Sequence, residues 1–357
     1  MSATPSYVRA LRLPRDFALI AVGLDAAVFV INMALLLVPS RPESEQLRNA
    51  YATPDVWVTL LIGMVMSWTL VSTLAWSHGR SALERMGMAR VALAHDARLR
   101  FGGVWVLAMV LNYYALTPLF YELQVMFMPG GRFEDAFAYS PRVYMGVAML
   151  LQSLVQLVVL VLGVWLAAWI ALAKSRVANA SVPRMEALDA GDAVAVDAPE
   201  ALGVPPRRAV ALVVAAMFSA LQLWGSLAAA RWAFPAPGLS VVVLLLTWGL
   251  PLVVGFALAW WGAWLGTRPS ALPATLPALP AVRPFRAVAA GVLSFALVQV
   301  GCIVIALAWL FLAAKASFSF YSGGGIVGFV LALVLVYMAL VMTLARSVTR
   351  RLYKNSL

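Results

Sequence analysis

Eight long apolar stretches set the architecture of this 357-residue chain. A transmembrane helix needs about 20 mostly apolar residues to cross about 30 Å of hydrocarbon, and each stretch is long enough to do so. The apolar runs are continuous, whereas the strands of an outer-membrane barrel alternate between apolar and polar residues. The sequence therefore predicts an all-α, polytopic membrane protein with eight transmembrane helices. The predicted spans are Phe17–Val38, Val56–Trp76, Phe101–Phe120, Val143–Ala173, Ala209–Ala230, Leu239–Gly266, Val288–Ala314 and Ile326–Ala345.

The composition supports a membrane environment and one integrated domain. Hydrophobic residues make up 63% of the chain and charged residues 11%. A soluble domain has about 25% charged residues, so water is not the main solvent of this chain. We predict an N-terminal four-helix half (1–176), a flexible cytoplasmic tether (177–206) and a C-terminal four-helix half (207–357), which together form a single membrane domain.

The basic residues lie mainly in alternate connectors. The segments on one side hold 20 of the 26 Lys and Arg residues, and the segments on the other side hold the remaining 6. Because cytoplasmic connectors are enriched in Lys and Arg, this distribution predicts four helical hairpins with both termini in the cytoplasm. The six outer basic residues are Arg41, Arg48, Arg132, Arg142, Arg231 and Lys315.

The same distribution explains the net charge of +11 without a nucleic-acid partner. Arginine outnumbers lysine 23 to 3, which indicates GC-rich coding and favours a bacterium. We therefore expect a multi-pass protein of the bacterial cytoplasmic (inner) membrane. Its expected partners are the bilayer, with the anionic lipids of the inner leaflet, and other membrane subunits are a further candidate. Residues 77–100 would form either a surface helix on that leaflet or a solvated connector helix.

Asp25 is the most suggestive single residue. It lies eight residues into the first span, about 12 Å along a helix that rises 1.5 Å per residue. A carboxylate at this depth is costly and usually faces the helix bundle or a wet cavity. Asn32 follows at i+7 on the same face, and no Lys or Arg lies well inside a span. Asp25 is thus a candidate proton-binding group; the alternatives are a neutral Asp hydrogen-bonded to a neighbouring helix, or a span that begins later.

Other polar side chains are dispersed along the spans. They would line a polar pathway or join helices by hydrogen bonds, the latter being the common role of such groups. Pro118 and Pro251 lie inside spans and are candidate helix kinks. The remaining candidate polar residues are Asn112, Gln152, Gln156, Gln222 and Gln299.

No pattern of residues indicates catalysis or a bound cofactor. The two histidines, His78 and His95, lie in one connector, and the chain contains no HExxH, GxSxG or Walker A motif. We therefore predict no catalytic residues, no cofactor-binding residues and no metal ligands, and we expect a protein that is not an enzyme.

Two functional readings remain. In the first, the chain is a transporter, permease or flippase-like protein for a small molecule, ion or lipid, with Asp25 as the candidate for proton coupling. In the second, it is a non-catalytic membrane subunit or scaffold of an envelope assembly. A cavity that reaches Asp25 would favour transport, and a sealed apolar surround would favour the scaffold.

Single cysteines introduced at each end of a Cys302→Ala chain test the predicted topology. Because both ends are expected in the cytoplasm, neither should react with a membrane-impermeant maleimide in intact cells, and both should react after permeabilisation. A cysteine in the outer connector 129–142 is the positive control. Ends that label on opposite faces would contradict an even number of spans.

Overall fold

The prediction of an all-α protein is confirmed by the computed structural model, in which the described residues form helices and no strands. Eight helices among these residues are long and apolar enough to cross a membrane, which is compatible with an integral membrane protein. The described residues are 12–36, 45, 49, 51–85, 96–127, 130–132, 141–179, 206–233, 240–268, 282–315 and 323–354. The eight candidate spans are Leu13–Leu35, Val56–Glu84, Ala97–Leu123, Val147–Ala173, Pro206–Ser226, Val241–Gly266, Pro284–Leu312 and Val327–Tyr353.

The chain divides into two compact units. The first unit comprises residues 1–205 and 223–250, and the second comprises residues 206–222 and 251–357. Most of the predicted tether (177–206) lies outside the described residues, although helix α7 continues to Asn179. The division into two four-helix halves, the four hairpins and the cytoplasmic termini stay predictions.

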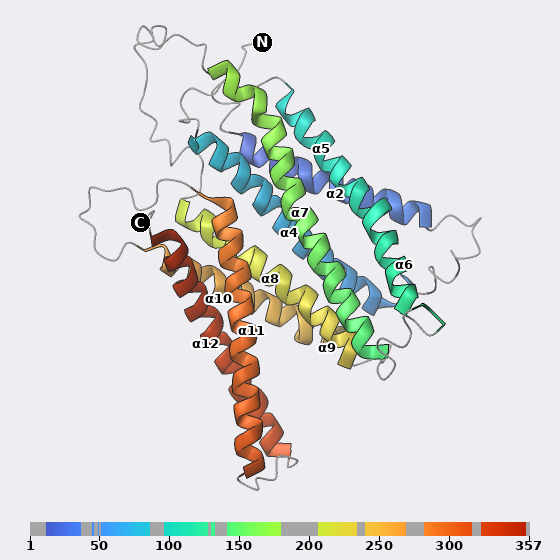
Figure 1. Ribbon diagram of the computed structural model, residues 1–357, viewed down its shortest axis with the longest axis vertical. Helices are drawn as coiled ribbons and strands as arrows, with labels where there is room; N and C mark the ends of the chain where they lie inside the picture. Colours follow the sequence, from blue (N-terminus) through green and yellow to red (C-terminus); the bar gives the residue numbers. More distant parts are fainter. Residues whose placement is uncertain are drawn as a thin grey trace. The chain divides into compact units, whose positions relative to one another are not determined.

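Three helices of the first unit follow one another in alternating directions (Figure 1). Helix α2 (Leu13–Leu36) packs against α4 (Pro54–Arg85), and α5 (Ala97–Leu111) packs against both α2 and α7 (Pro141–Asn179). The contacts of the glycines give the directions of α2 and α4. Gly79, near the end of α4, lies against Pro14 and Phe17 at the start of α2, so the two helices are antiparallel.

Helices α2 and α5 run parallel, and their starts are joined by two contacts. Arg98 donates a hydrogen bond of 2.8 Å from Nε to Oδ2 of Asp16. The rings of Phe17 and Phe101 are stacked with their centroids 4.2 Å apart, and both side chains are fully buried. Since an aromatic pair stabilises by about 0.5–1.5 kcal/mol beyond the area that it buries, these contacts fix the register of α2 against α5.

Residues 77–85 continue helix α4, so the prediction of a separate surface or connector helix is wrong for this segment. The Arg80 Nε donates to Oε1 of Glu84 over 2.8 Å, and its guanidinium lies over the ring of Trp76 at 5.5 Å from the centroid. Because the charge of Arg80 is paired within the helix, the helix continues past the apolar run. The rest of the predicted segment, residues 86–95, lies outside the described residues. The buried polar residues of this turn are Ser77, His78, Arg80 and Ser81.

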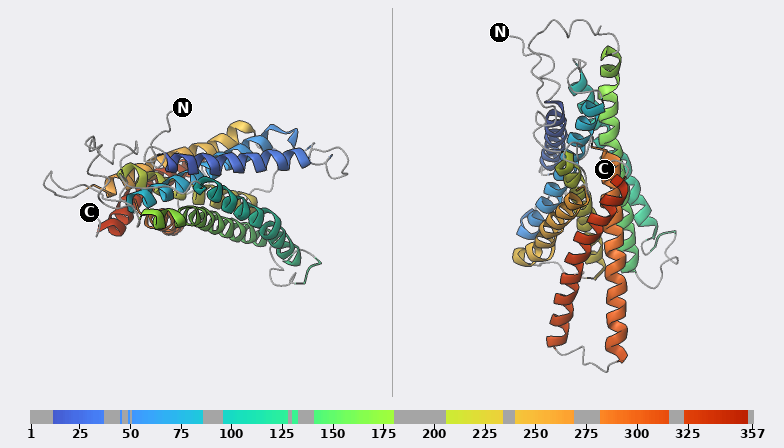
Figure 2. Two further views of the ribbon diagram at one scale, coloured as in Figure 1. Left: turned by 90° about the horizontal axis from the view of Figure 1, so that it is seen from above. Right: turned by 90° about the vertical axis from the view of Figure 1, so that its left-hand side faces the viewer.

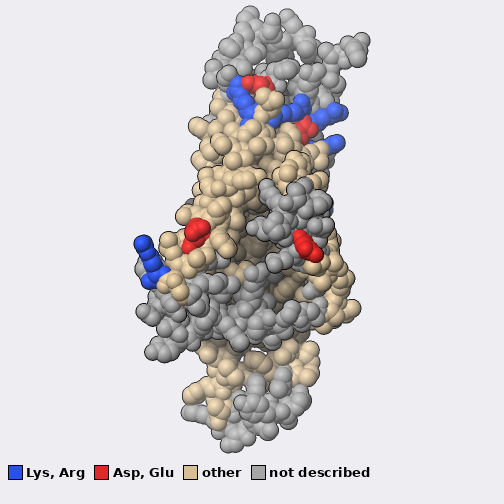
Figure 3. Space-filling view, turned by 90° about the vertical axis from the view of Figure 1, so that its right-hand side faces the viewer, with Lys and Arg blue, Asp and Glu red and all other residues tan. Residues whose placement is uncertain are grey.

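Charged side chains are sparse over much of the surface. On the face drawn in Figure 3, many of the described charged side chains lie in one group in the upper part of the view, a few more lie lower down, and most of the other described surface is uncharged. Large apolar side chains are exposed along the spans, among them Leu107 of α5 (67%) and Val30 of α2 (62%). Such an apolar surface is stable in contact with lipid and costly in contact with water.

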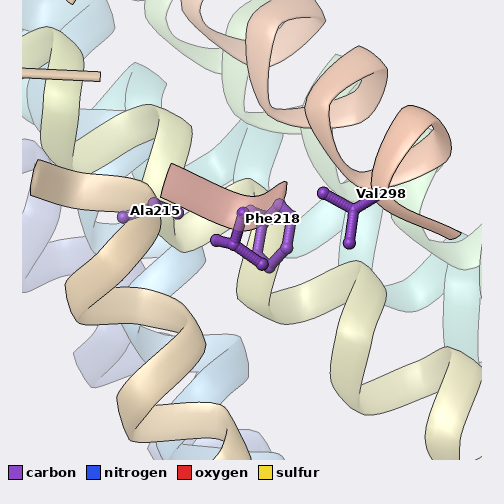
Figure 4. Close-up of a cluster of buried hydrophobic side chains, with 5 residues drawn as sticks. Ala215, Phe218 and Val298 are labelled. Carbon is purple, nitrogen blue, oxygen red and sulfur yellow. The ribbon is translucent and has the colours of Figure 1, made fainter. Parts of the chain in front are cut away.

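The second unit is built from the first part of α8 (Pro206–Ala233), α10 (Leu250–Gly266), α11 (Pro284–Lys315) and α12 (Gly323–Tyr353). Helices α11 and α12 run alongside each other (Figure 2). Side chains from all four helices form its buried apolar core (Figure 4). Phe295 packs against this core, and the edge of one ring of the Phe218–Phe295 pair meets the face of the other. The core residues are Ala215, Phe218, Ala259, Val298 and Val341.

Two glycines bring α10 and α12 close together. A Cβ atom added to Gly262 would lie 2.5 Å from the carbonyl oxygen of Met342, and one added to Gly266 would lie 2.5 Å from that of Arg346. No side chain fits at either position without a shift of backbone. The spacing of four residues places both glycines on one face of α10, which is how small residues allow close helix packing in membranes.

The close contact predicts that Gly262→Ala destabilises the protein. The added methyl group meets a backbone carbonyl, and overpacking of this kind costs about 1–3 kcal/mol. Gly328→Ala in α12 is the matched control, because nothing lies within 4 Å of that position and alanine favours a helix by up to about 1 kcal/mol over glycine. Thermal unfolding in detergent should show a lower midpoint for Gly262→Ala only. Equal midpoints for wild type and Gly262→Ala would contradict the packing.

The buried ion pair of α4 gives a second stability prediction. Arg80 and Glu84 are 1% and 4% exposed, and removal of one partner of a buried pair costs about 3–5 kcal/mol. Glu84→Gln should therefore lower the midpoint of unfolding markedly. Asp96→Asn is the control: it removes the partner of Arg100 from a pair that is much more exposed, where about 0–1 kcal/mol is expected. Similar shifts for both variants would disprove the special role of Arg80.

Candidate functional site

A partly open cavity of about 200 Å³ lies within the first unit. Helices α2, α4, α5, α7 and the end of α8 contribute its walls, together with a π-helical turn, η1 (Asn112–Leu116). Polar side chains and aromatic rings share the lining with aliphatic groups. Its lining residues are Asp25, Ser67, Val71, Trp105, Ala108, Met109, Asn112, Tyr113, Gln156, Val159, Leu160 and Trp224.

Asp25 is the one charged residue among those that line the cavity. The indole Nε1 of Trp68 donates a hydrogen bond of 2.8 Å to its Oδ2 atom. The antiparallel packing of α2 and α4 causes this meeting, since it brings the middle of one helix against the middle of the other. A hydrogen bond to a charged acceptor stabilises by about 1.5–3 kcal/mol, so Trp68 holds the carboxyl group in a fixed position at the cavity.

Asn112 lies at the point where the third span departs from α-helical geometry. In η1 the backbone N–H of Thr117 bonds to the carbonyl oxygen of Asn112, five residues earlier, and the Thr117 hydroxyl donates to the same oxygen over 2.9 Å. The Oδ1 atom of Asn112 is buried and has no hydrogen-bond partner within the described part of the chain. A π-helical turn often marks a functional site, and here it places an unsatisfied acceptor at the cavity wall.

Proline accounts for the π-helical turn. Pro118 has no N–H group, and its ring excludes the carbonyl of the residue four positions earlier, so the preceding turn widens. The same arrangement recurs in the sixth span, where η3 (Leu245–Gly249) precedes Pro251 and the N–H of Leu250 bonds to the carbonyl of Leu245. Each predicted kink site therefore follows a π-helical turn in the structure.

Aromatic side chains form much of the remaining wall. Trp105 is 3% exposed, and its Nε1 donates a hydrogen bond of 3.2 Å to the carbonyl oxygen of Ala21. Tyr113 belongs to η1 and Trp224 to α8. Because Trp105 is fixed by a hydrogen bond and by burial, its ring presents a rigid surface to the cavity.

Three of the predicted polar residues, Asp25, Asn112 and Gln156, come together at this cavity. Asn32 and Gln152 belong to the same unit and do not line it. The other two predicted residues, Gln222 and Gln299, lie in the second unit. The amide Nε2 of Gln222 donates to the carbonyl oxygen of Pro251 over 3.2 Å. The last, Gln299, belongs to α11 of that unit.

The three tryptophans of the site, Trp68, Trp105 and Trp224, were not predicted from the sequence. A signal was available for Trp68, which lies more than halfway along its predicted span, whereas Trp in membrane proteins is enriched at the interfaces. An indole N–H in hydrocarbon needs an acceptor, so a tryptophan in the middle of a span indicates a polar partner on a neighbouring helix.

Among the residues that the structure describes, no three His, Cys, Asp or Glu side chains gather as the ligands of a metal ion would. The described residues form eight candidate membrane spans, which are compatible with an integral membrane protein, and a polar, aromatic-walled cavity beside a carboxyl group. No protein-family model, no curated protein and no solved structure matches the chain.

Proposed function

We propose that this protein is a transporter of the bacterial inner membrane, which binds a small solute in the cavity of its first unit. One observation carries this proposal: the cavity of about 200 Å³ reaches Asp25 inside the first span. A carboxyl group at such depth destabilises a helix in the bilayer unless it has a function or a partner. Trp68 supplies a hydrogen bond to Asp25, and the cavity supplies space for water, a proton or a solute.

The polar groups of the wall support solute binding over a purely structural role. If Asp25 served only to join α2 to α4, the hydrogen bond from Trp68 would suffice. The protein would then be more stable with apolar side chains around Asp25 than with the polar side chains that line the cavity. Instead Asn112, which lines the cavity, has a buried oxygen without a hydrogen-bond partner among the described residues, at a cost of about 1–3 kcal/mol. A ligand or ordered water that donates to this oxygen would recover that cost.

The orientation that we propose is cytoplasmic for both termini, in accord with the 20 basic residues on that side and 6 on the other. Transport through the cavity requires that it become accessible from each side in turn. The π-helical turns before Pro118 and Pro251 are the candidate points of bending, because they interrupt the regular hydrogen-bond pattern of two spans. The role is not enzymatic in this proposal.

Asp25→Asn tests the proposed function in proteoliposomes. The variant keeps an oxygen that Trp68 can reach and removes the negative charge, so we expect solute-dependent proton movement to fall at least tenfold. A pH-sensitive dye trapped in the vesicles reports proton movement upon addition of amines, amino acids, sugars or carboxylates. Glu122→Gln is the matched control, since that carboxylate is exposed on α6 (Thr117–Phe127) and does not line the cavity.

Two results would contradict the proposal. One is equal flux for wild type and Asp25→Asn. The other is a wild-type protein that moves none of these solutes and purifies in mild detergent with a stoichiometric partner. The second result would favour the alternative function, a non-catalytic subunit or scaffold of an envelope assembly.

A further inference from the structure

We propose that the cavity of the first unit selects a small organic cation, bound through its ammonium group between the carboxylate of Asp25 and the aromatic side chains of the wall. This inference rests on the proposed function, because it names the class of solute that the same site would take. The ammonium group could belong to a free amine in water or to the headgroup of a lipid.

The charge of the wall excludes anions. Asp25 is negative when ionised, and no Lys, Arg or His belongs to the described lining residues. An anion would meet an uncompensated carboxylate in a site of low dielectric constant, where like charges repel strongly. A cation would complete the ion pair that the sequence itself leaves without a basic partner inside the spans.

The aromatic side chains favour an organic cation over a hydrated metal ion. Trp105, Tyr113 and Trp224 line the cavity, and the faces of such rings attract ammonium groups, with quaternary ammonium ligands as the best-known case. Metal cations such as Ca²⁺ prefer six to eight oxygen ligands. Three large rings occupy wall area that a site built for such an ion would give to oxygen atoms.

The size and the polar groups limit the ligand further. Cavities for drug-sized ligands measure about 300–1,000 Å³, and this cavity of about 200 Å³ is smaller. Asn112, Gln156 and Ser67 line the site, and the side-chain oxygen of Asn112 is buried without a hydrogen-bond partner in the described part of the chain. These groups can accept hydrogen bonds from an amine or a hydroxyl group, so choline and ethanolamine have suitable dimensions and chemistry as probes.

Equilibrium binding of radiolabelled choline to the full-length protein tests this proposal. The protein is placed in nanodiscs of phosphatidylglycerol, a lipid without an ammonium group. Tetramethylammonium and ethanolamine should displace choline. The uncharged isostere 3,3-dimethyl-1-butanol should be at least tenfold weaker, and NaCl should displace choline no better than its ionic strength predicts. Saturable binding with this order of competitors supports the proposal.

Variants locate the binding to the cavity. Asp25→Asn should weaken choline binding at least tenfold, which corresponds to about 1.4 kcal/mol, and Glu122→Gln should leave it unchanged. If Asp25→Asn fails to fold, Tyr113 provides a second test that leaves the carboxylate intact. Tyr113→Phe keeps the ring and should retain most of the affinity, whereas Tyr113→Leu removes the ring and should weaken binding several-fold.

The outcomes separate this proposal from the proposed function. Absence of saturable choline binding, equal competition by the uncharged isostere, or unchanged binding in Asp25→Asn would overturn the cation site. Asp25-dependent flux of another solute would then still support transport. Choline binding without flux would keep the cation site and contradict transport. Repetition in nanodiscs that contain phosphatidylethanolamine identifies the source: a raised apparent Kd indicates a lipid headgroup, and an unchanged Kd indicates a free amine.

Discussion

Hydrocarbon offers a polar side chain neither a hydrogen-bond partner nor a counter-charge, and the polar contacts of the spans follow from this constraint. The carboxyl group of Asp25 receives the indole N–H of Trp68 from the neighbouring helix. Thr343 satisfies its hydroxyl within its own helix, by donating to the carbonyl oxygen of Ala339 over 2.7 Å. A cavity adds a third solution, because water or a ligand can then serve as the partner. The site at Asp25 combines a hydrogen bond from a neighbouring helix with a cavity.

At the ends of two spans, arginine side chains lie over tryptophan rings. Arg80 lies over the ring of Trp76, four residues earlier, and Arg268 lies in the same relation to Trp264 at 4.6 Å. Arg80 also pairs with Glu84, whereas residues 201–357 contain no acidic residue at all. In the second unit the ring of Trp264 is shared with a second guanidinium, that of Arg207, at 5.2 Å. Aromatic rings thus replace carboxylates as partners for arginine in the acid-free part of the chain.

The spans were predictable because each needs only a long apolar run, and all eight runs correspond to helices. The end of α4 was not predictable, because its last turns depend on the Arg80–Glu84 pair and no hydropathy pattern indicates that pair. Asp25, Asn112 and Gln156 were predicted as site residues because they are polar and lie in apolar runs. Whether they come together depends on how several helices pack. Asn32 shares a helical face with Asp25 and does not line the cavity. Seven residues advance a helix by about 10.5 Å, which separates two side chains on one face by almost two turns.

The two units also differ in how their helices fill space, and this difference bears on where a ligand can bind. In the second unit, Gly262 and Gly266 let α10 approach the backbone of α12, so that not even a methyl group fits at these two positions without a shift of backbone. In the first unit the widened turn at Asn112–Leu116 coincides with large rings that cannot pack as closely as glycine. Bulky side chains on irregular backbone leave a void, and a void lined by a carboxyl and an amide is stable only when it is occupied. The polar groups of the cavity therefore need water or the proposed ligand as partners, whereas the contact between α10 and α12 leaves room for neither.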